Sequence, residues 1–88
     1  MGAIAHYLIY ELKVLVDGLI YLYYGMTGVL AGTSDRSAIE ARKSWHISHP
    51  VKCLADIIGE ADSVTIRTVK TNVREKSDAL VDEVARND

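Results

Sequence analysis

Residues 3–32 form one long apolar stretch, and this stretch constrains the fold more than any other feature of the sequence. Its polar or small residues recur every three or four positions, at His6, Tyr10, Lys13, Asp17, Tyr21, Tyr24 and Gly28. At about 100° per residue, this spacing places them on one face of a helix. A helix from Ala3 to Leu30 would be about 40 Å long, whereas the core of a bilayer is about 30 Å thick. The stretch therefore predicts a long hydrophobic helix that spans a membrane once. A buried helix in a soluble oligomer remains the alternative.

Glycines recur along the same predicted helix and suggest where it contacts a neighbour. Close approach of two helices in a membrane requires small residues, and Gly28 and Gly32 form a GxxxG motif. The predicted helix-packing interface consists of Gly18, Gly25, Gly28 and Gly32. A second interpretation of Gly32 is a helix cap, because glycine commonly follows the last residue of a helix.

Two opposite charges interrupt the apolar stretch. Lys13 and Asp17 are four residues apart, so on a helix they would lie on one face and pair. Pairing lowers the cost of placing charge in hydrocarbon. We therefore predict an intramembrane polar pair with a structural role.

The rest of the chain has a different character, so the sequence divides into residues 1–32 and 33–88. The second part holds nine of the ten Lys and Arg residues and ten of the twelve Asp and Glu residues. Its apolar spacing predicts shorter amphipathic helices at Asp35–Trp45, Pro50–Ile58 and Val69–Ala85. Ser34, Asp35 or Ser37 is suited to cap the first of them. Residues 63–73 carry both strand and helix signals. The predicted fold class is all-α, with one hydrophobic helix followed by two or three shorter ones.

The sequence gives little sign of chemistry. We find no nucleotide-binding or hydrolase motif, and the net charge of −2 does not favour nucleic acid as a partner. His46, His49 and Cys53 are metal-ligand types, but Pro50 interrupts any helix through all three. We therefore assign them structural roles and predict no metal and no cofactor.

A second small group lies on the predicted helix at Asp35–Trp45. Trp45, with Arg42 and Lys43, suits either a membrane-surface anchor or half of a small binding patch. It is equally suited to an ordinary tryptophan between surface and core.

The overall layout is common among small accessory subunits of energy-converting membrane complexes. On this analogy we expect a non-catalytic subunit of a respiratory-chain or ATP synthase assembly, which stabilises the complex by helix packing. Its partners would be the other subunits and the lipid bilayer, with no nucleic acid and no small-molecule substrate. The expected location is the mitochondrial inner membrane, with a bacterial or other organelle membrane left open. The alternative is a soluble all-α interaction or regulatory module that homo-oligomerises or docks on a larger protein.

Overall fold

The long apolar stretch folds as a β-hairpin, so the prediction of an all-α fold with a transmembrane helix is wrong. The computed structural model describes residues 3–49 and 58–87. Its elements are β1 (Ile4–Val16), β2 (Leu19–Leu30), α1 (Asp35–Ser48), β3 (Ser63–Val73) and α3 (Lys76–Asn87). The three strands form one antiparallel sheet in the order β2-β1-β3. Among these residues, no helix combines the length and the apolar character needed to cross a membrane.

The hairpin turns at Asp17 and Gly18, in the middle of the stretch that was predicted to be helical. Both residues have positive φ, 50° and 78°, and Val16 pairs with Leu19 across the turn. An Asp-Gly pair between two apolar runs is a strong hairpin signal, because a type I′ turn needs positive φ at both central residues. This local preference, together with strand-favouring Val, Ile and Tyr, outweighs the helical spacing of the polar residues.

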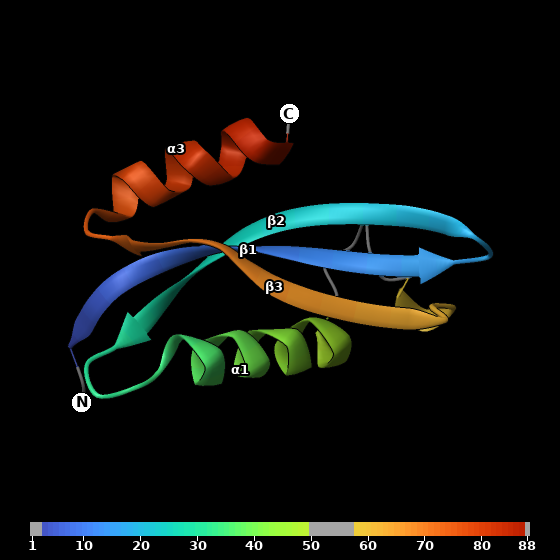
Figure 1. The fold of residues 1–88 in the computed structure, drawn as a ribbon, viewed down its shortest axis with the longest axis horizontal. Helices are drawn as coiled ribbons and strands as arrows, with labels where there is room; N and C mark the ends of the chain where they lie inside the picture. Colours follow the sequence, from blue (N-terminus) through green and yellow to red (C-terminus); the bar gives the residue numbers. More distant parts are fainter. Residues whose placement is uncertain (1–2, 50–57, 88) are drawn as a thin grey trace.

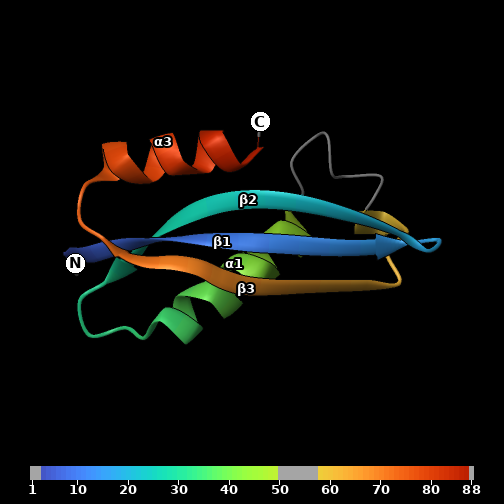
Figure 2. The same ribbon diagram turned by 45° about the horizontal axis from the view of Figure 1, so that its top comes forward.

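The central strand β1 is apolar throughout much of its length because it is buried on both faces. Leu8 and Tyr10 pack with Ile39 of α1, whereas Ile9 packs on the other side with Ala79 of α3. The two helices accordingly cover opposite faces of the sheet (Figure 1; Figure 2). A strand of this kind does not alternate between apolar and polar residues, and its sequence resembles that of a buried helix.

The second part of the chain agrees better with its predicted elements. The helix predicted from Asp35 is confirmed as α1, and the Ser34 side chain caps it by accepting a hydrogen bond from the Ser37 N–H. Residues 63–73, which carried both signals, form β3, and the last helix begins at Lys76 rather than at Val69. The predicted helix from Pro50 to Ile58 falls almost wholly on residues 50–57, which lie outside the described residues.

Candidate active site

The hydroxyl group of Tyr10 lies at the centre of a cluster that joins β1, β2 and α1. Only 1% of Tyr10 is exposed, and its hydroxyl oxygen is 2.6 Å from Nε2 of His46. Gly25 is the cross-strand partner of Tyr10, and a Cβ atom at Gly25 would overlap the Tyr10 hydroxyl group. The absence of a side chain at Gly25 therefore creates the space in which the Tyr10 ring lies.

Arg42 approaches the same hydroxyl group from α1. Its Nε–H donates a hydrogen bond of 3.3 Å to the Tyr10 oxygen, and its guanidinium carbon lies 4.4 Å from the centre of the Trp45 ring. Within residues 3–49 and 58–87, no carboxylate forms an ion pair with Arg42. The guanidinium group is thus held in place by neutral groups and keeps its charge available for an anion.

His46 fills the space beneath Arg42. It is 1% exposed, and its ring packs edge-on against the rings of Tyr10, Tyr23 and Trp45. Its Nδ1 atom is buried and has no hydrogen-bond partner among the described residues. Burial, followed by the charge of Arg42, lowers the pKa of His46, so the imidazole is neutral at neutral pH.

Tyr10 also stays neutral at neutral pH. Burial raises the pKa of its hydroxyl group, and the hydrogen bond from Arg42 opposes this shift only in part. Tyr10 and His46 therefore form a neutral hydrogen-bonded pair, and the positive charge of the cluster resides on Arg42.

The C-terminal end of helix α3 is fixed on the outer strand β2. The side-chain amide of Asn87 pairs with both backbone groups of Tyr24: Oδ1 accepts from the N–H at 2.9 Å and Nδ2 donates to the carbonyl at 2.7 Å. This contact fixes the end of α3 on β2, between Tyr23 and Gly25. Glu83 lies one turn earlier on α3, and its negative charge contributes to the raised pKa of Tyr10.

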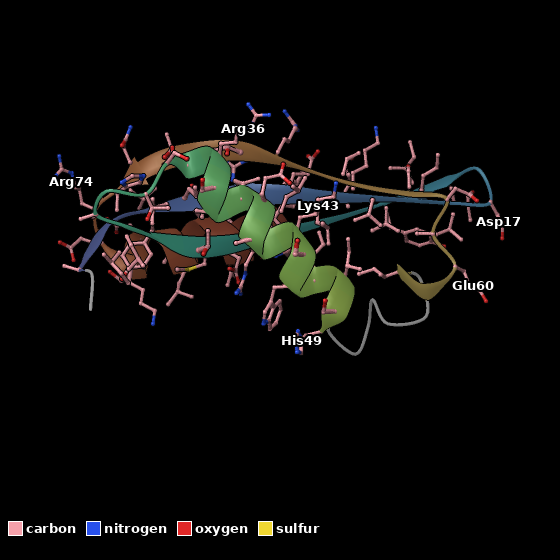
Figure 3. The ribbon with its side chains drawn as sticks, turned by 90° about the horizontal axis from the view of Figure 1, so that it is seen from below. Asp17, Arg36, Lys43, His49, Glu60 and Arg74 are labelled. Carbon is pink, nitrogen blue, oxygen red and sulfur yellow. The ribbon has the colours of Figure 1, made fainter. Side chains whose placement is uncertain are left out.

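A groove runs from this cluster along the space between β2 and α1. It has a volume of about 340 Å³. Arg42 and Trp45 line one part of it. Leu30 adds an apolar side chain, and the remaining lining residues are small or carry hydroxyl groups: Thr27, Gly28, Thr33, Ser37, Ala38 and Ala41. Figure 3 shows α1 crossing the sheet on this side, with Lys43 on the helix and His49 at its end. The charged and hydrogen-bonding groups of the cluster thus adjoin a space large enough for a ligand.

The glycines that were predicted to form a helix interface lie at four different places in the hairpin and the loop after it. Gly18 occupies the hairpin turn, and Gly32, with a φ of 85°, lies in the turn before α1. Gly25 adjoins Tyr10, and Gly28 lies against the Ile4 side chain. The helix that was predicted to carry this interface is absent from the described structure.

The other singled-out residues are also separated. Lys13 is exposed on β1, while Asp17 lies in the hairpin turn, where its N–H donates to the Asp62 side chain; no ion pair joins Lys13 and Asp17 in the described structure. His49 stacks on Trp45, away from the Tyr10 hydroxyl, and Cys53 lies outside the described residues. The described part of the chain contains no group of three or more metal-ligand side chains.

Sequence reasoning missed most of the cluster. Arg42 and His46 are four residues apart, a spacing that predicts one helix face, but His46 was grouped instead with His49 and Cys53. Tyr10 and Tyr23 join them only through the pairing of the strands and the packing of α1 on the sheet. The assembled cluster can bind an anion at Arg42. Comparison with protein-family models, with curated proteins and with solved structures gives no match to this chain.

Proposed function

We propose that this protein hydrolyses phosphodiester bonds in a nucleic acid, with Arg42 as the residue that binds the phosphate. The observation that carries the proposal is the environment of Arg42. Its guanidinium group is held by the Tyr10 hydroxyl group and the Trp45 ring, without a carboxylate among the described residues. Phosphate is a preferred ligand of a guanidinium group that is fixed in this way.

The groove supports a phosphate ligand because its polar groups are hydroxyls. Thr27, Thr33 and Ser37 line it and can donate hydrogen bonds to phosphate oxygens. Gly28, which has no side chain, and the small Ala41 leave room for a bulky ester. A site that is lined by donors and one fixed cation suits the negative charge that develops during phosphoryl transfer.

A nucleic acid is favoured over a small phosphate ester by the residues around the cluster. Trp45 is 40% exposed, and aromatic rings beside basic residues provide stacking surfaces for bases. Arg36 adds positive charge on the same helix. With a chain net charge of −2, we expect binding to be local and modest rather than driven by a broad basic surface.

The proposed reaction adds water across a P–O ester bond. The water oxygen bonds to phosphorus, the bond to the ester oxygen breaks, and the departing oxygen takes a proton from solvent. The attacking water loses a proton to solvent as its oxygen bonds to phosphorus. Arg42 stabilises the charge on the phosphoryl oxygens.

A divalent cation would add to the charge stabilisation that Arg42 provides to the phosphoryl oxygens. Magnesium ions usually keep several waters and bind in part through the oxygens of substrate phosphates. We therefore expect that cleavage requires a divalent cation.

The expectation of a non-catalytic subunit of a membrane complex remains untested. It rested on a long hydrophobic helix, and β1 and β2 take the place of that helix. The same applies to the expected location in the mitochondrial inner membrane.

The experiment is an end-labelled cleavage assay. Purified protein is incubated with double-stranded DNA, single-stranded DNA or RNA, in Mg²⁺ or in EDTA. We expect new strand ends from at least one of these substrates in Mg²⁺ only, and a strong reduction with Arg42→Gln. Arg74→Gln, at an exposed arginine between β3 and α3, is the matched control and should cleave like the wild type. No cleavage of any substrate by folded protein in Mg²⁺ would contradict the proposal.

A further inference from the structure

The outer edge of β2 is covered along only part of its length. β2 is an outer strand of the sheet, so every second residue directs its backbone N–H and C=O away from β1. Tyr24 is one of these residues, because both of its backbone groups bind the Asn87 side chain. Asn87 thus pairs with Tyr24 as the backbone of a neighbouring strand would.

Toward the hairpin turn, no hydrogen bond among the described residues covers the same edge. The pairing of β2 with β1 has no irregularity between Leu19 and Tyr24, so Ile20 and Leu22 direct their backbone groups outward, as Tyr24 does. The described hydrogen bonds include none to the outward groups of these two residues. Unpaired backbone groups along a strand edge form a template for another strand.

The side chains of this free segment are apolar and exposed. The exposed fractions are 60% for Leu19, 57% for Ile20, 39% for Tyr21 and 52% for Leu22. Four consecutive large apolar residues at an open strand edge are unusual, because soluble proteins protect such edges with charges, proline or bulges. The segment contains none of these.

We infer that two copies of this chain associate by pairing their β2 edges in antiparallel orientation around Tyr21. In this register Ile20 of one copy pairs with Leu22 of the partner through backbone hydrogen bonds, and the reverse pair forms by two-fold symmetry. The two sheets then continue as one six-stranded sheet. The inference does not depend on the proposed catalytic function.

The outward backbone groups without a described partner determine this register. Asn87 occupies the edge at Tyr24 and the hairpin turn ends at Gly18, so these groups belong to Ile20 and Leu22. Tyr21 lies midway between them. An antiparallel pair centred on Tyr21 therefore matches both residues of one copy with those of the other.

A second copy suits this edge better than an unrelated peptide. The segment is uncharged, so the symmetric pairing brings no like charges together. On one face Ile20 meets Leu22 of the partner subunit, and on the other face the two Tyr21 rings meet across the axis. The contact is short, so we expect a dimer that dissociates on dilution.

The first test is sedimentation velocity over a wide range of protein concentration. We expect a monomer–dimer equilibrium for the wild type. In Ile20→Pro the proline removes the outward N–H but no hydrogen bond to β1, and proline is tolerated at such positions of edge strands. This variant should keep its circular dichroism spectrum and remain monomeric. Ile20→Thr, which keeps the backbone N–H, should dimerise more strongly than Ile20→Pro.

The second test locates the symmetry axis and does not depend on a proline substitution. In a Cys53→Ala background, Tyr21→Cys carries the only thiol of the chain. The two Tyr21 positions would form a non-hydrogen-bonded pair with Cα atoms about 4.5 Å apart, within the range that a disulfide accepts. Mild oxidation should then give a covalent dimer, whereas Ile47→Cys, which is also exposed, should not. A wild type that is monomeric at every concentration, or equal crosslinking of the two cysteine variants, would overturn the inference.

Discussion

The hydroxyl oxygen of Tyr10 lies 2.6 Å from Nε2 of His46, although the two residues are 36 positions apart in the chain. This contact joins the central strand β1 to α1 and lies beneath the guanidinium group of Arg42. It links the stability of the fold to the geometry of the proposed phosphate site, so substitutions there should affect both.

Removal of the Tyr10 hydroxyl group should destabilise the protein. In Tyr10→Phe the ring still fills its space, but Arg42 and His46 lose their shared partner in a buried environment. We expect a loss of about 1–3 kcal/mol in the free energy of unfolding. Tyr21→Phe is the matched control, because Tyr21 is exposed, and it should change stability little. Urea denaturation of both variants measures the difference, and equal stabilities would contradict the role of the Tyr10 hydroxyl group.

A methyl group at Gly25 should disturb the same contact from the opposite strand. In Gly25→Ala the new Cβ atom would overlap the Tyr10 hydroxyl group, so the ring must move away from its position. Overpacking of this kind costs about 1–3 kcal/mol. Gly59→Ala is the control, because a Cβ atom at Gly59 would meet no atom within 4 Å. If thermal denaturation shows that Gly25→Ala is as stable as Gly59→Ala, the close packing of Tyr10 against β2 is incorrect.

The neutral state of His46 should make stability depend on pH. Burial lowers the pKa of His46 in the folded protein below its ordinary value of 6.5. As the pH falls through about 6.5, the unfolded chain therefore binds a proton at this residue before the folded chain does, and the free energy of unfolding decreases. Above this pH the residue is neutral in both states and has no such effect.

His46→Gln isolates this contribution. Glutamine does not titrate and still offers an oxygen to the Tyr10 hydroxyl group. The other two histidines are present in both proteins, so the difference between the two stability profiles reports on His46. Below about pH 6.5 we expect a smaller decrease in stability for His46→Gln than for the wild type. Parallel profiles from pH 8 to pH 5 would exclude a buried neutral imidazole.

On the opposite face of the sheet, Glu11 joins all three strands. Its carboxylate accepts hydrogen bonds from Arg67 of β3, at 3.0 Å and 3.3 Å, and from the Tyr24 hydroxyl of β2, at 2.8 Å. The hydrogen bonds from Arg67 and then Tyr24 lower the pKa of Glu11 below its ordinary value. This stabilisation is present above pH 4.5 and is lost as the pH falls through the lowered pKa.

The corresponding substitution is Glu11→Gln. Arg67 is largely exposed, so we expect a loss of about 1 kcal/mol or less at neutral pH, reduced further by high salt. The difference between the variant and the wild type should vanish toward acidic pH, as measured by urea denaturation. A difference that persists unchanged in acid would show that charge is not its source.

The fold differs from its sequence-based prediction for reasons visible in β1 and the hairpin turn. Leu8, Ile9 and Tyr10 are each buried, although consecutive residues of a strand face opposite sides. The resulting apolar run has no period of two and is not distinguishable from a buried helix by spacing alone. The decisive local signal was the Asp17-Gly18 pair, which the apparent helical spacing of the polar residues obscured.

The proposed site was only partly accessible to sequence reasoning. Arg42 and His46 lie one helical turn apart on a helix that was correctly predicted, so their common face could be inferred. Tyr10 reaches them from β1, which is distant in the sequence. Its proximity follows from the packing of α1 on the sheet, which no local pattern predicts.

The most direct test of the account is the single-turnover rate constant for cleavage of one labelled nucleic acid substrate by wild type, Arg42→Ala and Lys43→Ala. Lys43 is the neighbouring cation on α1 and forms no described ion pair, so its loss controls for a change in net charge. If Arg42 stabilises the charge on the phosphoryl group, Arg42→Ala should lose about 10²–10³-fold in rate while Lys43→Ala stays near the wild-type value. Equal rates for Arg42→Ala and Lys43→Ala would contradict the assignment of Arg42 as the phosphate-binding residue.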